Sequence, residues 1–416
     1  LSFVVMACMP SQLFPRLADF SLPLAPMPRW RHNVASAITL LAVVLLVVAG
    51  LSASRDPLDN PLPLTFWTLW WVGFTFVVAI FGDLWNLFNP WRALYRLAIA
   101  TFRAAPPRLY PERLGYWPAV ILLLAFGWFE LVYWAPQDPA HLAVAVIAYA
   151  VITLGGMLVY GEERWLERGE AFSVFFRMVS WLSPFQANSD RQLSVGLPCR
   201  RLLGIGRLPA SGIAFIVVAL ASVSFDGLSR TFWWLGLAGE NPLEHPGRSS
   251  LVGVNTFGLM ATAAALACAY FAAVRLGSGL AGDAHRPGYG EYVVAIVPIA
   301  FGYHFAHYLP TFLVDAQYAV RALGDPGSLG WNLFGARDLN VTTSFLSHHA
   351  SVHTIWNVQV AGIVAAHVAA VFVAHVLALR RHRTAPAALI SQLPMTALMV
   401  GYTIFGLWLL ATPVAG

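Results

Sequence analysis

Histidine is the residue type whose placement most clearly indicates chemistry in this sequence. Nine of the twelve histidines follow residue 284, and four of them fall within long apolar runs. Ionisable side chains at membrane depth are costly and usually face a bundle interior, a cavity or a bound ion. The nine are His285, His304, His307, His348, His349, His353, His367, His375 and His382.

The apolar run 291–317 carries the first pair. His304 and His307 lie one helical turn apart and share a stripe of about 100° with Tyr308 and Asp315. A polar stripe on an apolar helix is typical of helices that line a cavity in a membrane protein.

The next run, 356–379, crosses in the opposite direction and carries His367 at a comparable depth. Three neutral imidazoles are a ligand set for zinc or copper that leaves one position open for water. His375, two turns deeper, is expected to lie outside this set. The predicted site consists of the ligands His304, His307 and His367, with Asp226, Asp315 and Tyr308 beside them.

The histidines before this run form a second candidate. If residues 347–353 are helical, His349 and His353 present two imidazoles on one face at a spacing that suits a metal. A solvated loop without a function is the alternative interpretation.

Four interpretations of the histidines within the apolar runs remain open. They can be hydrogen-bond partners between helices or ligands of a non-haem metal. They can also hold a b-type haem, with His367 opposite His304 or His307. The fourth interpretation is a proton or ion pathway. Asp83 and Glu130 lie near the ends of apolar runs, and we expect both to be interfacial.

The composition explains why these residues must be placed by membrane helices. Of the 416 residues, 58% are hydrophobic and 11% are charged, whereas a soluble domain carries about 25% charged residues. The three cysteines are scattered, which excludes a thiolate metal site. The net charge of +5 comes from arginines in loops between apolar runs, and the chain has no phosphate-binding glycine loop. No nucleic-acid partner is therefore expected; the expected partner is the lipid bilayer.

An apolar run of about 20 residues can cross a bilayer. We find nine such runs and expect an all-α, polytopic transmembrane helix bundle that forms one membrane domain, residues 1–416. The predicted spans are 34–51, 64–84, 116–135, 141–161, 209–228, 251–276, 291–317, 356–379 and 389–414.

The arginines orient these spans. With a cytoplasmic N-terminus, 20 of the 25 arginines fall on the cytoplasmic side, as the positive-inside rule requires. We therefore expect a multi-pass protein of the bacterial inner membrane with a periplasmic C-terminus. Residues 1–10 lack a basic region before their apolar stretch, so we expect no signal peptide there.

Two further segments are predicted to be cytoplasmic interfacial helices. After Asn89, a favourable N-cap, an apolar stripe through Trp91 and Tyr95 is opposed by arginines. The segment 162–182 repeats this pattern, with aromatic residues opposed by glutamates. Both helices are expected to lie at the membrane surface.

With these residues in view, the chain resembles bacterial membrane proteins described as fenitrothion hydrolase-like. The resemblance is carried by GDLWNLFNPWRAL (82–94), GEAFSVFFRM (169–178), SVSFDGLSRTFWW (222–234), FGYHFAHYL (301–309) and AAHVAAVFVAH (365–375). It implies hydrolysis of an organophosphate ester and supplies no assignment of metal ligands.

Three functions follow as expectations. The first is a metal-dependent hydrolase of an ester or phosphoester, in which zinc or copper activates water. The second is a non-enzymatic or haem-binding accessory subunit of a respiratory or photosynthetic membrane complex. The third is a small-molecule or ion transporter.

Overall fold

The computed structural model describes residues 20–26, 32–102, 106–187, 192–241, 247–283, 285–327 and 329–412. Within these residues nearly all regular structure is helical, and nine helical stretches are long and apolar enough to cross a membrane. The predicted all-α polytopic bundle is therefore confirmed. Residues 1–10, where we expect no signal peptide, lie outside the described residues.

Each predicted span corresponds to one of these nine stretches. The first five contain α3 (His32–Ser52); α4 (Pro61–Pro63), η1 (Leu64–Phe74) and α5 (Thr75–Phe81); η2 (Glu112–Leu114) and α8 (Trp117–Leu131); α9 (Pro139–Tyr160); and α12 (Ala210–Ser229). The last four contain α14 (Arg248–Leu280); α15 (Tyr289–Tyr292), η5 (Val293–Ala295) and α16 (Ile296–Leu323); α17 (His349–Arg381); and α18 (Ala385–Ala411).

The shorter elements connect these spans. They are α6 (Trp85–Phe88), α7 (Pro90–Thr101), α10 (Glu162–Arg168), α11 (Ala171–Ser180), η3 (Arg200–Gly204), α13 (Phe232–Leu237), η6 (Leu333–Asp338) and η7 (Ser344–Leu346). Three short strands accompany them: β1 (Ser21–Pro26), β2 (Phe185–Ala187) and β3 (Gln192–Gly196).

Three helices begin with the same local device, an Asn or Asp followed by proline. Asn60, Asn89 and Asp138 each accept a hydrogen bond from a backbone N–H in the first turn, and proline occupies the first helical position. Proline fits there because its missing N–H would be unpaired anyway and its fixed φ suits the helix. The sequence therefore sets where α4, α7 and α9 begin.

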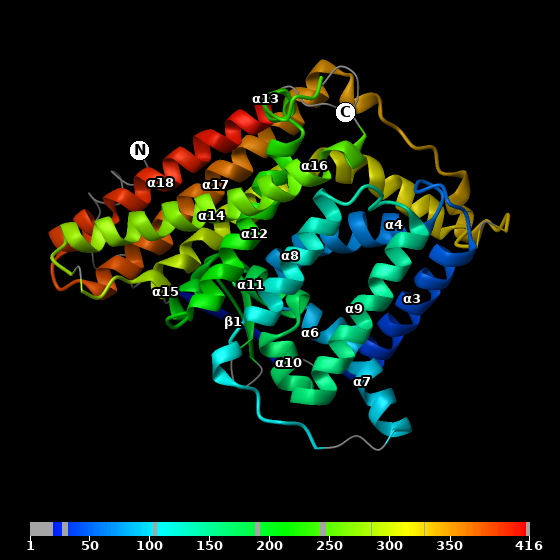
Figure 1. Cartoon of the computed structure of the whole chain (residues 1–416), viewed down its shortest axis with the longest axis horizontal. Coiled ribbons are helices and arrows are strands. Elements are labelled where there is room, and N and C mark those ends of the chain that lie inside the picture. Colours follow the sequence, from blue (N-terminus) through cyan, green and yellow to red (C-terminus); the bar gives the residue numbers. More distant parts are fainter. Residues whose placement is uncertain are drawn as a thin grey trace.

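The long helices form two groups (Figure 1). The helices α14, α16, α17 and α18 pack side by side, whereas α3, α4, α7 and α9 lie together on the other side of the molecule. The groups meet through η1, which contacts α4 of the second group and α16 of the first, and beside it α12 contacts α14 and α16 as well as α8. The candidate site described below lies along this junction.

The three strands form one antiparallel sheet in the order β1-β3-β2. Ser21 pairs with Gly196, and Phe185 pairs with Val195. These strands are not predicted from the sequence, because each is short and the sheet joins segments that are distant in sequence. The pairing places the chain before the first span on the same side as the chain between the fourth and fifth spans.

The two predicted interfacial helices differ in the structure. The first is α7, a single helix capped by Asn89 as expected. The second segment is divided into α10 and α11, and most side chains of α11 are buried. The expectation that 162–182 is one helix lying at the surface is therefore wrong: α11 packs inside the bundle against α5 and α8.

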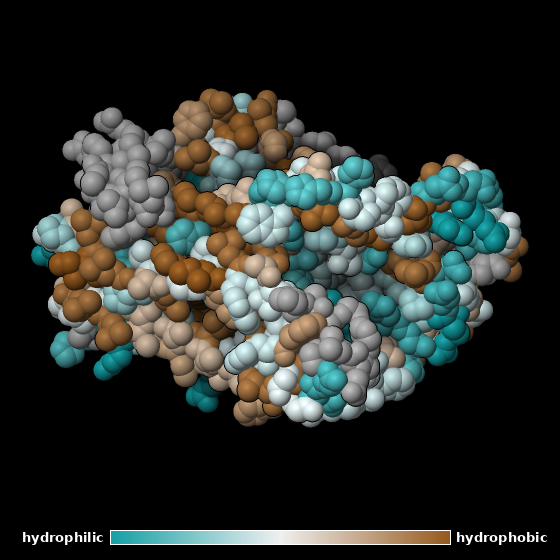
Figure 2. Space-filling model, turned by 90° about the horizontal axis from the view of Figure 1, so that it is seen from above, coloured by the Kyte–Doolittle hydropathy of each residue, from teal (hydrophilic) through white to brown (hydrophobic). Residues whose placement is uncertain are grey.

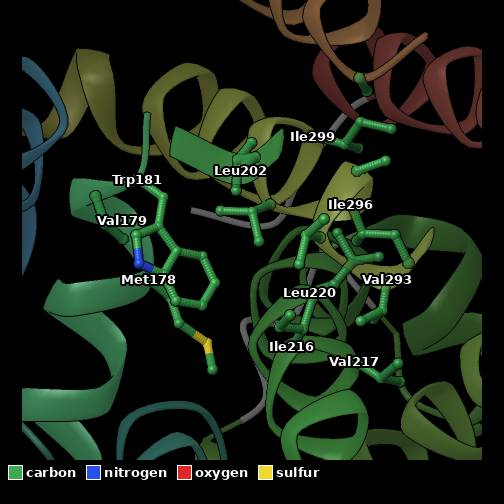
Figure 3. Close-up of a cluster of buried hydrophobic side chains, with 14 of the residues drawn as sticks. Met178, Val179, Trp181, Leu202, Ile216, Val217, Leu220, Val293, Ile296 and Ile299 are labelled. Carbon is green, nitrogen blue, oxygen red and sulfur yellow. The ribbon is translucent and has the colours of Figure 1, made fainter. Parts of the chain in front are cut away.

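The buried face of α11 belongs to the main hydrophobic core. Met178 and Val179 of α11 belong to the same cluster of buried side chains as Ile216 and Leu220 of α12 (Figure 3). The outer surface is also rich in apolar side chains, and Figure 2 shows wide hydrophobic areas beside a hydrophilic end. An apolar surface of this extent is expected where helices face lipid.

Candidate functional site

Four polar side chains meet where the two helix groups join. Glu130 lies in the last turn of α8, Asp226 lies in the last turn of α12, and His307 and Tyr308 lie in the middle of α16. We call these four residues the quartet. The ends of α8 and α12 lie at the same level of the bundle, which brings the two carboxylates to one segment of α16.

Asp226 is the centre of the quartet. Its Oδ2 atom lies 2.8 Å from His307 Nε2 and accepts a hydrogen bond of 2.8 Å from the Tyr308 hydroxyl. Its Oδ1 atom lies 3.0 Å from Arg230 Nη2. Asp226 is only 2% exposed, so its charge is balanced by these neighbours and not by water. In return, the Asp226 carboxylate raises the pKa of Arg230 above its ordinary value.

Glu130 is the second carboxyl group of the quartet. Its Oε1 atom lies 2.9 Å from the Tyr308 hydroxyl oxygen and accepts a hydrogen bond of 3.0 Å from Trp71 Nε1. Among the described residues no arginine or histidine forms an ion pair with it. Arg248 lies near, but donates to the backbone carbonyl of Glu130 at 2.9 Å. The two carboxyl groups therefore have different surroundings.

A small cavity of about 60 Å³ borders the quartet. Glu130, Tyr308, His304, Thr75 and Ser222 contribute polar side chains, and the rest of its lining is mostly apolar. His304 is 5% exposed and its Nε2 atom has no hydrogen-bond partner among the described residues. A cavity of this size holds a few water molecules.

One aromatic residue of the cavity lining, Trp71, lies on an unusual stretch of backbone. The stretch η1 is a π-helix of eleven residues, and π-helical segments are rare and frequent at functional sites. Trp71 of η1 packs edge-on against His304, with ring centroids 5.3 Å apart, while its N–H holds Glu130. One side chain thus positions two polar groups of the site.

The structure does not bring His367 to the other two predicted ligands as part of a metal-binding group. Where α16 and α17 meet, a side chain at Gly302 would collide with Ala366, so Ala366 faces α16. The next residue on a helix is turned by about 100°. His367 accordingly faces α18, where its Nδ1 atom lies 3.0 Å from Thr403 Oγ1.

Within the described ranges no group of three or more His, Cys, Asp or Glu side chains is arranged to hold a metal ion. His349 and His353 do stack on one face of α17, with ring centroids 6.2 Å apart. Asp315 is half-buried two turns beyond His307. His375 lies 3.2 Å from Gln392 on α18. Binding of zinc, copper or haem by these histidines stays a prediction.

Sequence reasoning found three members of the quartet and missed Glu130. Asp226 was expected beside His307, and the two are in contact. Glu130 was expected to be interfacial, but it is half-buried and bound to Trp71 and Tyr308. The available signal was its place in the last turn of its span, at the level of Asp226.

Comparison with known proteins yields no matching family model, no matching curated protein and no matching solved structure.

Proposed function

We propose that the protein is a proton-coupled transporter of a small molecule or ion in the bacterial cytoplasmic membrane. The observation that carries the proposal is the Tyr308 hydroxyl, which lies within hydrogen-bond distance of both Glu130 and Asp226. A hydroxyl carries one proton and can donate to only one carboxylate at a time. Both contacts become hydrogen bonds when one carboxyl group is itself protonated.

Glu130 is the group that would hold this extra proton. Asp226 is paired with Arg230 and His307, whereas no cation is paired with the Glu130 carboxyl among the described residues. The hydrogen bonds then run from Glu130 through Tyr308 to Asp226 and His307. Chains of this composition within membrane spans are typical of proton relays.

We call the hydrogen-bonded chain of Glu130, Tyr308, Asp226 and His307 the relay. It connects two different environments. Glu130 and Tyr308 border the small cavity, while the His307 side chain is 23% exposed. A proton that enters at His307 can therefore reach the cavity through groups already in hydrogen-bond contact. In a transporter, this step would couple the protonation of Glu130 to the binding or release of cargo.

Infrared spectroscopy tests the extra proton directly. The spectrum of the purified wild type minus that of Glu130→Gln is expected to show the carbonyl band of a protonated carboxyl group, because the subtraction cancels any band from other buried carboxyl groups such as Glu170. Asp59→Asn is the matched control, because Asp59 is an exposed carboxylate outside the spans. A difference spectrum without this band, like that of Asp59→Asn, would contradict the assignment.

Transport in proteoliposomes tests the coupling. Vesicles under a pH gradient are exposed in turn to carboxylic acids, amines and phosphate esters, with a pH-sensitive dye enclosed. We expect at least one class to change the rate of proton entry in the wild type, and Tyr308→Phe to reduce that change to the level of empty vesicles. Tyr160→Phe, whose ring packs against Trp165, should behave as the wild type.

A hydrolase is the second candidate, favoured by the contact between His307 and Asp226. With Nε2 engaged by Asp226, the remaining ring nitrogen of His307 can act as a general base towards water. The test is hydrolysis of nitrophenyl esters and phosphoesters by the purified protein. Loss of activity in His307→Ala supports a catalytic histidine, and loss after chelation, with restoration by zinc or copper, supports the metal-dependent form.

A further inference from the structure

A second cavity, much larger than the first, lies between the peripheral helices of the bundle. It measures about 410 Å³, which falls within the range of about 300–1,000 Å³ that is usual for ligand pockets. Its walls come mainly from α3, α9, η1 and α8, with α7 contributing Pro90 and Trp91. We call it the large cavity; Phe126 lines both it and the small cavity.

The lining excludes charged and strongly polar ligands. Among the described residues that line the large cavity there is no Asp, Glu, Arg or His, and the hydroxyl groups of Thr39, Thr65 and Tyr149 are the few polar side-chain atoms besides indole nitrogens. The Tyr149 hydroxyl is already engaged, since it donates to Glu170. Eight of the lining side chains are aromatic. The surface available to a ligand is therefore almost purely hydrocarbon.

The large cavity also lies beside α3 and leaves part of this helix without packing partners in the protein. This helix contacts α4, α7 and α9, and the cavity separates its middle from η1. Protein interiors are close-packed, and voids much larger than a water molecule are few because the atoms around a void lose their dispersion contacts. A cavity of this size and composition within the spans is stable when an apolar molecule fills it.

We propose that the large cavity binds one hydrocarbon chain of a membrane lipid. The cavity lies between membrane spans, so the molecules that reach it are those dissolved in the hydrocarbon core. A flexible acyl or prenyl chain can adapt to an apolar space of this volume, and the aromatic rings of Trp70, Trp91 and Phe129 offer contact to it. The binding site is separate from the quartet and does not depend on the transport proposal.

Variants on α9 test this site. Ala145 lines the large cavity, so Ala145→Phe fills part of it. Val144 is the matched control, because it is 59% exposed on the same helix and does not line the cavity. Each full-length protein is purified with extensive detergent washing, and the lipid that remains is extracted and quantified by mass spectrometry.

We expect about one lipid per wild-type chain and per Val144→Phe chain, and a severalfold loss in Ala145→Phe. A retained glycerophospholipid identifies an acyl chain, and a retained quinone or polyprenyl lipid identifies a prenyl chain; either outcome supports the site. Equal retention in both variants, or no retained lipid in the wild type, overturns it.

A second variant keeps the test decisive if Ala145→Phe fails to fold. Ala42 lines the large cavity from a different helix, α3, so Ala42→Phe should also reduce the retained lipid while the protein elutes as a single species. Returning the extracted lipid should raise the apparent Tm of the wild type in detergent, with a smaller rise for Ala42→Phe. An unchanged wild-type Tm would contradict binding.

Discussion

The buried carboxylate of Asp226 contacts three other side chains. It contacts His307 and Tyr308 on α16 and Arg230 beyond the end of its own helix. Burying a carboxylate is costly, and the cost is offset only when its partners are in place. The charge distribution of the quartet therefore depends on this residue more than on any other of the four.

Replacement of Asp226 by asparagine should destabilise the protein measurably. The asparagine side chain would keep the shape but lose the charge that holds His307 and Arg230. Breaking a fully buried ion pair costs about 3–5 kcal/mol, and Arg230 is 48% exposed, so we expect a loss of about 1–3 kcal/mol. Thermal unfolding in detergent measures it, with Asp59→Asn as the control; an unchanged Tm would contradict the central role of Asp226.

Glu170 is a buried carboxyl group outside the spans. It caps α11 by accepting hydrogen bonds from the backbone N–H groups of Phe172 and Ser173, and it also accepts one from Tyr149. Burial raises the pKa of Glu170 above its ordinary 4.5, although these donors oppose the rise. The folded protein therefore binds this proton more tightly than the unfolded chain does.

The stability contributed by Glu170 should accordingly fall with rising pH. A raised folded pKa gives a contribution that is complete below 4.5 and is lost as the pH passes through the folded pKa. The loss is at most about 1.4 kcal/mol per pH unit. The variant Glu170→Gln carries no ionisable group at this position. Its Tm should therefore rise relative to that of the wild type as the pH rises. A difference independent of pH would show that Glu170 does not titrate in this way.

At the scale of helices, hydropathy predicts the spans because each one needs about 20 apolar residues in sequence. The caps at Asn89 and Asp138 are visible for a similar reason, since they act within one turn. The π-helical form of η1 and the burial of α11 arise from packing against helices distant in sequence. Local patterns do not carry that information, and the amphipathic pattern of α11 fits a buried helix as well as an interfacial one.

The same reasoning explains which part of the site was predictable. The polar stripe on α16 follows from helical periodicity, so His307 and Tyr308 were correctly placed on one face. The rotation of α17 depends instead on the close approach of Gly302 and Ala366. That contact turns His367 towards Thr403. Neither the register nor the angle at which α17 packs on α16 can be read from the spacing of the histidines.

Close helix packing at Gly277 provides a prediction at this scale. A Cβ atom on Gly277 of α14 would collide with the backbone carbonyl of Ser391 on α18, whereas one on Gly279 would meet open space. Gly277→Ala should separate α14 from α18 and destabilise the protein by about 1–3 kcal/mol. Gly279→Ala should be neutral or stabilising by up to about 1 kcal/mol, because alanine favours a helix. Equal Tm values in detergent would contradict this packing.

At the scale of the whole molecule, contacts between loops agree with nine alternating crossings. Arg55, after the first span, pairs with Asp138, before the fourth, at 2.6 Å. Arg92, after the second span, pairs with Glu162, after the fourth, at 2.6 Å. Arg381 at the end of α17 pairs with Asp283, before the seventh span, at 2.7 Å. Each pair joins segments that alternating crossings place on one side of the membrane.

The orientation of the bundle can be tested at the two ends of α9. Gln137 precedes this helix and Glu163 follows it, and both side chains are exposed. The excess of arginines in the segments around Arg92 and Arg164 predicts that the Glu163 end is cytoplasmic. In a background without native cysteines, Gln137→Cys should react with a membrane-impermeant maleimide on intact cells, and Glu163→Cys only after lysis. The reverse result would invert the bundle and move His307 to the cytoplasmic half, so that protons would enter the relay from the cytoplasm. Reaction of both cysteines on intact cells would show that α9 does not cross the membrane.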